Sequence, residues 1–387
     1  MSNRAGSFII NKIGGEEVRC FLPSHLPPTP PLDLARLTAL LNLANTATGR
    51  LDGISTVLPD PALFVWMYLR KEAIVSSQIE GTQSSLSDLL LFDIGEPSTA
   101  PADDVREVSQ YIKALNHGLS RLRELPLSLR LLREMHRILL SSGRGEDKQP
   151  GEFRTSQNWI GGSRPGNALF VPPAPQDLAD CLRGFEQFLH HSMASENPLL
   201  HAALAHVHFE SIHPFLDGNG RLGRALITLL LCTSGMLREP VLYLSLYLKR
   251  NRQRYYDLLQ LVRLEGKWEE WCEFFLAGVA ETAEQAADTA RRITALLEED
   301  HRKIEAMPAA ANSLRLHGYL KREPFTSVKA ATKKLGLSTP TVQGAFDRLE
   351  GAGLLHEITG RSRGRLYAYT KYVEILEEGT EPLAQTG

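Results

Sequence analysis

Helical periodicity dominates this sequence and is the feature that most restricts its fold. From Leu32 to about residue 299, leucine and other apolar residues recur at three- and four-residue steps, the spacing that places them on one face of an α-helix. The alternation of strands and helices that a parallel sheet requires is missing from this region. The pattern therefore predicts a mainly α-helical protein.

Changes in composition divide the 387 residues into four regions. A proline-rich stretch, LPSHLPPTPP, ends an N-terminal segment that we expect to be an extended arm, because proline cannot continue a helix. The predicted bounds are 1–31 for this arm, 32–125 for an N-terminal helical region, 126–300 for a helical core with the helices that follow it, and 311–376 for a basic C-terminal domain.

One segment inside the helical core has the pattern of a β-hairpin. Residues 154–173, RTSQNWIGGSRPGNALFVPP, alternate polar and apolar side chains around two turn signals, Gly161-Gly162 and Pro165-Gly166. Such turns flanked by alternation are typical of hairpins.

The C-terminal domain is basic, with eleven Lys and Arg against four Asp and Glu between residues 311 and 372. Three short helices and a ribbon are expected, and Ser338 can cap the third helix with Pro340 in its first turn. This order predicts a winged helix-turn-helix. The side chains that could contact DNA are Thr341, Gln343 and Arg348 of the third helix and Arg361, Arg363 and Arg365 of the wing. A role in protein interaction is the alternative.

The overall composition is that of an ordinary globular protein, with 43% apolar and 23% charged residues. A net charge of -2 argues against a chain that coats nucleic acid along its whole length. The four cysteines are scattered, which favours reduced thiols, and the longest apolar run, ALITLLLCTSGML, is too short to span a bilayer. We therefore expect a cytoplasmic protein that does not use a membrane.

The stretch HPFLDGNGRLGR, residues 213–224, raises the question of a nucleotide site. Its glycines match the dinucleotide fingerprint G-x-G-x-x-G, but the preceding residues have helical spacing, whereas that fingerprint follows a strand. A zinc site is the second alternative, because four histidines, His201, His206, His208 and His213, lie in this segment. His206 and His208 point apart on a helix, and a His-Glu-x-x-His pair is missing, so packing roles are favoured for His201, His206 and His208.

The same stretch has the parts needed to handle a phosphate. Backbone N–H groups around Gly218, Asn219 and Gly220 can form an anion nest at the start of a helix, whose dipole favours negative charge. Asp217 is a hard oxygen ligand suited to Mg²⁺, and a neutral His213 could accept a proton from a hydroxyl. Arg221 and Arg224 lie one turn apart and can both reach phosphates.

Residues 213–224 resemble the signature of the Fic family of protein adenylyltransferases, His-Pro-Phe-x-Asp/Glu-Gly-Asn-Gly-Arg-x-x-Arg, at every fixed position. The resemblance extends over roughly residues 20–300 and implies a helical bundle with a β-hairpin flap over the active site. It also implies that His213 is the general base, that Asp217 holds Mg²⁺ and that the flap includes Ile160, Gly161, Gly162 and Ser163. The residues that it implies for ATP binding are Gly218, Asn219, Gly220, Arg221, Leu222, Gly223, Arg224, Tyr255 and Tyr256.

A second stretch, SSQIEG, resembles the inhibitory helix motif of the same family, with Ser76, Glu80 and Gly81 at the fixed places. Glu80 at the end of a helix could pair with Arg224 and keep that arginine from the γ-phosphate. The resemblance thus implies an autoinhibited enzyme of the N-terminal, intramolecular kind.

The expected activity is transfer of AMP from ATP, with Mg²⁺, to a Ser, Thr or Tyr hydroxyl of a target protein. Self-modification is expected as well, and a homodimer and DNA are possible partners. Two alternatives stay open. One is the removal of AMP from a modified protein, alone or beside the forward reaction, or the transfer of another phosphate-containing group. The other is a DNA-binding regulator whose Fic-like part senses nucleotides.

Overall fold

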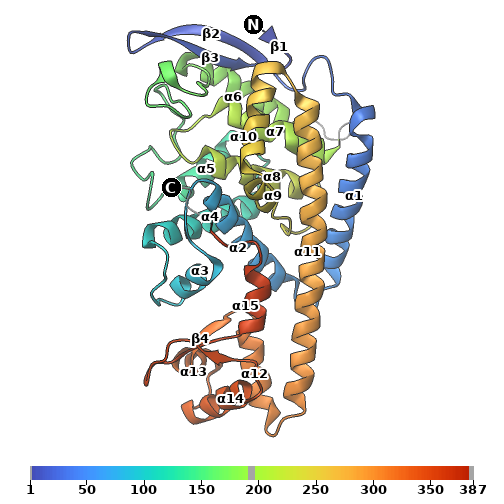
Figure 1. Cartoon of the computed structure of the whole chain (residues 1–387), viewed down its shortest axis with the longest axis vertical. Helices are drawn as coiled ribbons and strands as arrows, with labels where there is room; N and C mark the ends of the chain where they lie inside the picture. The colour runs from blue at the N-terminus through green and yellow to red at the C-terminus, as the bar shows by residue number, and fades with distance from the viewer. Residues whose placement is uncertain (1, 191–196, 383–387) are drawn as a thin grey trace.

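A 38-residue helix, α11 (Trp268–Glu305), runs along the molecule and joins a large helical body to a smaller C-terminal domain (Figure 1). The structure, a computed structural model, describes residues 2–190 and 197–382. Helix α1 packs along the part of α11 that lies in the helical body, and ion pairs such as Arg36–Glu273 connect the two helices. The body contains α1 (Leu34–Val57), α2 (Pro61–Ile79), α3 (Leu86–Asp93), α4 (Ala102–Arg121), α5 (Leu129–Leu139), α6 (Pro175–Leu189), α7 (Pro198–Ile212), α8 (Asn219–Thr233), α9 (Ser245–Arg250) and α10 (Arg252–Glu265).

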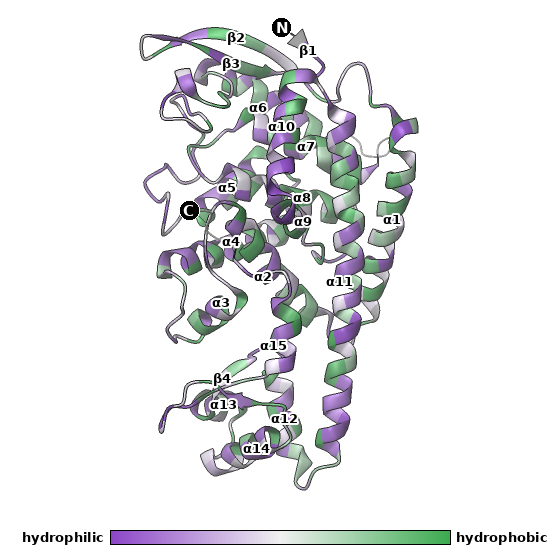
Figure 2. Ribbon diagram, in the orientation of Figure 1, coloured by the Kyte–Doolittle hydropathy of each residue, from purple (hydrophilic) through white to green (hydrophobic). Residues whose placement is uncertain are grey.

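Helices α7 and α8 form the centre of the body. Every residue of α7 from Leu199 to Ile212 is buried, and α8 is buried over most of its length. Figure 2 shows the contrast between these apolar central helices and the lower half of α11, where hydrophilic residues dominate. A helix that is buried on all sides is a rigid support, so the loop between α7 and α8 is held by two fixed ends.

The extended arm predicted for residues 1–31 is only partly correct. Residues 2–23 contain an antiparallel sheet of β1 (Ser2–Asn3), β2 (Gly6–Ile13) and β3 (Glu16–Pro23), in the order β1-β2-β3. The turn between β2 and β3 contains Gly14 and Gly15, both with positive φ, as a tight hairpin turn requires. Only the proline-rich residues before α1 lack regular structure.

The hairpin predicted for residues 154–173 is present in reduced form. One antiparallel bridge, Ile160 with Phe170, closes a loop that contains the short 3₁₀ helix η1 (Pro165–Asn167). The loop lies against the N-terminal sheet, because Phe21 N–H donates to Val171 O at 2.9 Å. The flap is thus supported by β3 rather than by a partner strand of its own.

The C-terminal domain combines helices with a small sheet of strand order β4-β6-β5. Its elements are α12 (Ala310–Leu320), β4 (Phe325–Ser327), α13 (Val328–Leu335), α14 (Thr339–Gly351), β5 (His356–Glu357), β6 (Leu366–Ala368) and α15 (Thr370–Glu377). Ser338 caps α14, as the sequence predicts, by accepting a hydrogen bond from Thr341 N–H. None of the helices in residues 2–190 and 197–382 is long and apolar enough to cross a membrane.

Candidate functional site

The loop between α7 and α8 begins and ends with left-handed backbone. His213, which caps α7, has φ of 48°, and Gly218, which caps α8, has φ of 75°. Positive φ strains a residue that has a Cβ atom, so it persists at His213 only because the surroundings hold it. The chain therefore reverses direction in a few residues and brings the His213 side chain next to the N-terminus of α8.

Two side chains of the flap hold the backbone of this loop. Arg154 donates to the carbonyl of His213 at 2.9 Å and to that of Pro173 at 2.6 Å, and it is 2% exposed. Asn158 donates to the carbonyls of Phe215, at 2.8 Å, and His213, at 3.3 Å. Burial lowers the pKa of Arg154 to about 10, so the guanidinium stays charged at neutral pH. These contacts stabilise the left-handed conformation at His213.

Asn219 and His136 fix the remainder of the loop. The Asn219 side chain accepts from Phe215 N–H at 2.9 Å and donates to Phe215 O at 2.8 Å. His136 accepts from Gly151 N–H through Nδ1 at 2.8 Å, so its Nε2–H donates to Asp217 O at 2.9 Å. The Asn219 side chain thus closes the turn, and only its backbone N–H remains for an anion.

The His213 imidazole is neutral at physiological pH. Burial, followed by the charges of Arg263 and Arg154, lowers the pKa of His213 to about 3. Its Nδ1 atom lies 3.9 Å from Oε2 of Glu210, one turn earlier on α7. A neutral imidazole can accept a proton, which is the state that a general base needs.

Arg221 is held inside the protein by a glutamate of α4. Its guanidinium donates to Glu107 at 3.0 Å, and both side chains are 2% exposed. Arg144 approaches the same carboxylate at 3.2 Å, and Asp217 lies 3.7 Å from Arg221. The pair places one fixed positive charge beneath the N-terminus of α8.

Arg224 is held by the end of α2. It donates to Ser76 Oγ at 2.8 Å, to Ser76 O at 2.9 Å and to Glu80 Oε1 at 2.7 Å. A Cβ atom at Gly220 would collide with that same carboxylate oxygen, so Glu80 lies directly against the first turn of α8. Burial alone would raise the pKa of Glu80, but Arg224 outweighs it and keeps the pKa below its ordinary value. An ionised carboxylate therefore occupies the place where the sequence predicts phosphate.

The residues present fit a magnesium ion that is bound mainly by its substrate. Across the described chain, residues 2–190 and 197–382, no three His, Cys, Asp or Glu side chains gather closely enough to form a complete metal site. Asp217 is partly exposed, and its Oδ1 accepts from Gly218 N–H at 2.6 Å. Mg²⁺ commonly uses one or two carboxylates together with substrate phosphates and water. Asp217 beside the helix N-terminus fits that arrangement.

The other residues predicted for the site lie at different depths. Leu222 and Tyr255 are buried, and the Tyr255 hydroxyl donates to His206 Nε2 at 2.9 Å, so Tyr255 supports the site from below. Tyr256 is partly exposed beside Tyr255, with ring centroids 5.0 Å apart.

The three other histidines of α7 pack in the core: His206 also contacts Gly223 O, His201 stacks on Phe188 and His208 on Phe185. The flap residues Gly161, Gly162 and Ser163 are exposed, and Ile160 is partly buried.

Sequence reasoning missed several residues that hold this site. These are Glu107, His136, Arg154, Asn158 and Glu210. Four of them lie more than fifty residues from the loop, and their local sequence carries no signal of a partner. Glu210 is the exception, because a glutamate one turn before a candidate base stands on the same helical face.

The side chains proposed to meet DNA are not all free. Arg348 donates to Ser313 Oγ at 3.0 Å and is therefore tied to the interior of its own domain. Gln343 donates to Asp347 at 2.8 Å, and Arg361 pairs with Glu96 of the helical body at 3.1 Å. Arg363 and Arg365 are exposed, as are Lys329, Lys333 and Lys334 of α13.

The chain is similar to known proteins over the region that contains this site. Two family models match, one described as Fic/DOC family N-terminal over residues 38–120 and one as Fic/DOC family over residues 126–231. The proteins named protein adenylyltransferase Fic from Drosophila virilis and Drosophila willistoni are each 35% identical to it over 178 residues, which is 46% of this chain. The aligned part is only about a third of the length of these relatives (32% and 31%).

Solved structures show the same fold at lower sequence identity. A Fic family protein from Desulfovibrio desulfuricans G20 superimposes with a TM-score of 0.56 and 21% identity, covering 85% of this chain and 95% of its own. A Fic-domain-containing signaling protein from Bacteroides thetaiotaomicron gives a TM-score of 0.52 and 20% identity, covering 65% of this chain and 96% of its own. With the motif, the loop geometry and both family matches, the chain belongs to the Fic/DOC family.

Proposed function

We propose that this protein is a protein adenylyltransferase that transfers AMP from ATP to a side-chain hydroxyl of a target protein, and that Glu80 inhibits it. The observation that carries the proposal is the position of one neutral imidazole, His213, beside a helix N-terminus with two buried arginines. The relatives named protein adenylyltransferase Fic, 35% identical to this chain over 178 residues, support the same activity.

In the proposed reaction His213 accepts the proton of the attacking hydroxyl. The hydroxyl oxygen forms a bond to the α-phosphorus of ATP, the bond to the bridging oxygen of the β-phosphate breaks, and pyrophosphate leaves. Backbone N–H groups at the start of α8 and the charges of Arg221 and Arg224 stabilise the phosphate oxygens. Mg²⁺, held by Asp217 when it is bound, would neutralise part of the phosphate charge.

In the proposed inhibited state Glu80 competes with ATP. Its carboxylate neutralises Arg224 and lies against Gly220, both of which the nucleotide needs. Like charges repel, so a phosphate cannot take this place until Glu80 moves away. Self-modification of the resting protein should therefore be slow.

Mass spectrometry after incubation with Mg-ATP tests the proposal. We expect an AMP adduct on the protein, more of it in Glu80→Gly and none in His213→Ala. Absence of any adduct from Glu80→Gly, with ATP and Mg²⁺ present and the protein folded, would contradict the activity. An equal adduct yield from wild type and Glu80→Gly would contradict inhibition by Glu80. Release of AMP from a modified protein would instead favour the reverse reaction.

We also propose that residues 310–377 form a winged helix-turn-helix whose exposed basic side chains contact nucleic-acid phosphates. Support comes from Arg363, Arg365 and the three exposed lysines of α13, which have no acidic partner within ion-pair distance among the described residues. A gel-shift assay on duplex DNA should show affinity that falls steeply as salt increases. Failure to bind at low salt would argue against this part of the proposal.

A further inference from the structure

Glu210 faces His213 inside the site, and the proposed reaction gives it no role. Its side chain is 7% exposed, and its Oε2 atom lies 3.9 Å from His213 Nδ1. Glu210 Oε1 and His213 Nδ1 are both buried and make no hydrogen bond of ordinary geometry to a described residue, although the Glu210 backbone carbonyl lies close enough to the His213 ring to act on its pKa. Oε1, the other oxygen of this carboxylate, lies against Gly223, and an unpaired buried polar atom costs free energy, so the carboxylate has a bonding capacity that the described contacts leave unused.

The surroundings of Glu210 leave room for its carboxylate. A Cβ atom at Gly223 would lie only 2.6 Å from Glu210 Oε1, so a glycine is needed one turn into α8. The charged groups that act on this carboxylate are Arg224, Glu80 and Arg263. Burial is the largest influence and raises the pKa of Glu210 to about 7. Near neutral pH this carboxyl group therefore exists in both its protonated and its ionised form, and its oxygens can form a further hydrogen bond.

We propose that Glu210 is a positioning residue for His213, whose Nδ1–H it binds when the reaction proceeds. This inference rests on the proposed adenylyl transfer. A closure of about 1 Å turns the observed 3.9 Å separation into a hydrogen bond. That bond fixes the tautomer in which Nε2 accepts the proton, and the carboxylate then stabilises the imidazolium. A buried imidazole without such a partner is a weak base.

The kinetic test compares Glu210→Gln with Glu210→Asp, each in the Glu80→Gly background. We expect kcat for Glu210→Gln to fall at least about tenfold, part of the roughly 10²–10⁴-fold that a positioned base supplies, with KM for ATP unchanged. The acidic limb of its pH–rate profile should move to lower pH, because the imidazolium loses its stabilising charge. Glu210→Asp should restore part of the rate. An unchanged kcat and pH profile in Glu210→Gln would overturn the proposal.

A spectroscopic arm separates this proposal from the activity itself. Nitrogen-15 spectra of the histidine side chains, assigned through His213→Ala, should show the Nδ1–H tautomer at His213 in the parent and a shift or loss of that signal in Glu210→Gln. If the parent makes no AMP adduct, adenylyl transfer is wrong, and the spectra still decide whether Glu210 orients His213. An identical His213 tautomer signal in both proteins would overturn the positioning role.

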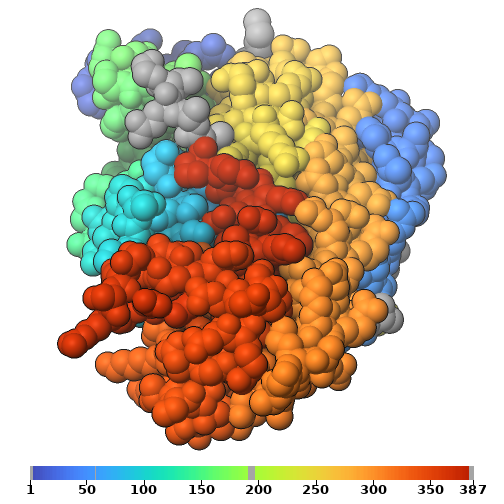
Figure 3. Space-filling model, turned by 60° about the horizontal axis from the view of Figure 1, so that its bottom comes forward, coloured from blue at the N-terminus to red at the C-terminus, as the bar shows by residue number. Residues whose placement is uncertain are grey.

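A second, independent observation concerns residues 377–382, the C-terminal segment, which form hydrogen bonds at the end of α2 that carries Glu80. Gln78, two residues before Glu80, is 1% exposed and donates to Thr380 O at 2.7 Å and to Ser84 O at 2.8 Å. Its Oε1 accepts from Lys249 Nζ at 2.7 Å, and Lys249 also donates to the carbonyl of Glu381. Figure 3 shows the red C-terminal segment lying in the seam between the cyan segment and the yellow-orange helices.

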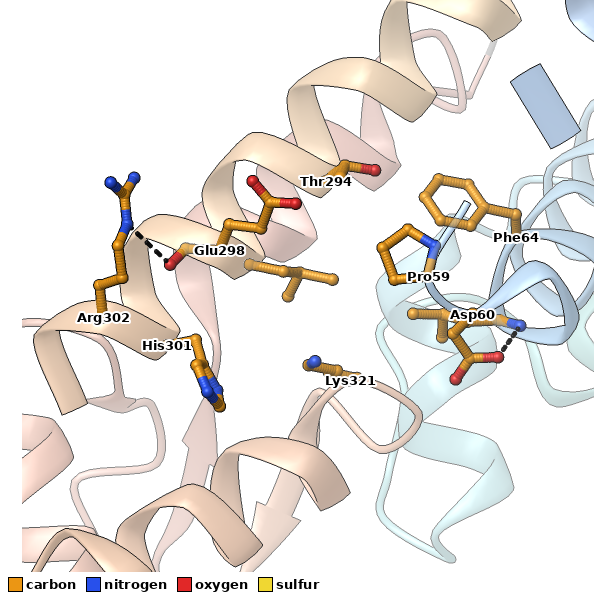
Figure 4. Close-up of a pocket in the computed structure, with 10 residues that line it drawn as sticks. Pro59, Asp60, Phe64, Thr294, Glu298, His301, Arg302 and Lys321 are labelled. Carbon is orange, nitrogen blue, oxygen red and sulfur yellow. Dashed lines mark hydrogen bonds between the residues drawn. The ribbon is translucent and has the colours of Figure 1, made fainter. Parts of the chain in front are cut away.

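The other end of α2 also meets the C-terminal domain, but less tightly. Asp60, which caps α2, pairs with Arg322 at 3.2 Å, and the Tyr372 hydroxyl lies 3.1 Å from Met67 Sδ. Beside these contacts is a cavity of about 380 Å³ between the start of α2, α11 and Lys321 (Figure 4). The C-terminal domain and the segment that follows it therefore contact α2 at its start, at Met67 and at Gln78 near its end, with a cavity beside the start of the helix.

We infer that residues 377–382 hold α2 in its inhibitory position, so that displacement of the C-terminal domain releases Glu80 from Arg224. The link is specific, because one N–H of the buried Gln78 amide would lose its acceptor, Thr380 O, if the segment moved away, while the bond to Ser84 O remained. A partner that binds the C-terminal domain could thereby change the population of the inhibited state.

Full-length variants that cut this link test the inference. Gln78→Leu removes the bond from α2 to Thr380 O, and Glu377→Ala removes the bond that ties the same segment to Ser87 N–H of the neighbouring α3; each should raise self-modification by about fivefold, the population change that one lost hydrogen bond allows. Neither should add to the rate of Glu80→Gly. Glu374→Ala, an exposed change on the same helix, is the control and should have no effect. Equal increases in the wild-type and Glu80→Gly backgrounds would overturn the inference.

Hydrogen exchange gives a readout that needs no activity. Amides of residues 76–82 should exchange faster in Gln78→Leu and Glu377→Ala than in wild type, whereas those of α8 should not. Unchanged exchange in residues 76–82 would overturn the inference even if the adduct yields changed.

Discussion

The two arginines of the motif are paired with glutamates of very different accessibility. Arg221 and Glu107 are both 2% exposed, and a second arginine, Arg144, approaches the same carboxylate. Arg224 is 1% exposed, but 32% of the Glu80 side chain is exposed. Both pairs have hydrogen-bond geometry, at 3.0 Å and 2.7 Å. The two pairs differ in whether solvent reaches the carboxylate: it reaches Glu80 but not Glu107.

This comparison separates a permanent part of the site from a replaceable one. The Glu107 carboxylate is buried and cannot be hydrated if its pair with Arg221 breaks, whereas the partly exposed Glu80 carboxylate can return to water, leaving the buried Arg224 in need of another anion. Glu107 therefore fixes Arg221 as part of the site floor. Glu80 is placed so that an anionic ligand can take over its contact with Arg224.

The largest effect on stability is expected from Glu107→Leu. Arg221 would lose its buried carboxylate and keep only Asp217, 3.7 Å away. We expect the free energy of unfolding, measured by urea denaturation, to fall by about 3 kcal/mol, the lower end of the effect of breaking a buried pair. Asp103→Ala, which breaks an exposed pair on the same helix, is the control and should change it by less than about 0.5 kcal/mol. An equal fall in the free energy of unfolding in the two variants would show that the buried Arg221–Glu107 pair contributes no more than the exposed Arg106–Asp103 pair.

A smaller loss is expected from Ser76→Ala. The Ser76 hydroxyl accepts a hydrogen bond from buried Arg224 at 2.8 Å, and bonds to charged groups are stronger than neutral ones. We expect the free energy of unfolding to fall by about 1.5 kcal/mol. The neighbouring Ser77→Ala is a matched control, because the Ser77 hydroxyl is buried without a hydrogen-bond partner in the described structure. A larger loss in Ser77→Ala than in Ser76→Ala would contradict this assignment.

The contrast between the two pairs also marks what the sequence can predict. Helical periodicity predicted the mainly helical fold, and the motif in residues 213–224 pointed to His213 and both arginines, which the structure brings together at one loop. Glu80 was predictable because it belongs to a local motif, SSQIEG. Glu107 was not, since a glutamate on an amphipathic helix looks like any solvated charge until α4 is packed against α8.

The N-terminal sheet and the flap illustrate the same limit. The prolines before α1 predict an extended arm, but the residues ahead of them pair as β2 and β3, and the turn at Gly14 and Gly15 is a local signal of that hairpin. The flap forms a single bridge because β3 and Arg154 support it, and both contacts join distant parts of the chain. When the partner of a residue lies far away in the sequence, the neighbouring residues give no sign of that contact.

A weaker effect on stability, with a larger effect on ligand binding, is expected from Glu80→Gln. Because the Glu80 carboxylate is partly exposed, the free energy of unfolding should fall by less than about 1 kcal/mol. Mg-ATP should raise the Tm of the variant more than that of wild type, since ATP no longer displaces a carboxylate from Arg224. Differential scanning fluorimetry over a series of ATP concentrations measures both. An equal ATP-dependent rise in Tm for the two proteins would mean that Glu80 does not compete with the nucleotide.

The smallest effect is expected from pH. Burial alone would raise the pKa of Glu80, but pairing with Arg224 holds it below its ordinary value, so the folded protein binds this proton less readily than the unfolded chain. The stabilising contribution of the pair is therefore present above the unfolded pKa, about 4.3, and is lost only as the pH falls through the lower folded value. The ratio of self-modification between Glu80→Gln and wild type should stay constant from pH 6 to pH 9, as measured with labelled ATP. A ratio that approached one between pH 6 and pH 7 would show that Glu80 becomes protonated there, and its carboxylate would then not be the stable partner of Arg224 that the geometry indicates.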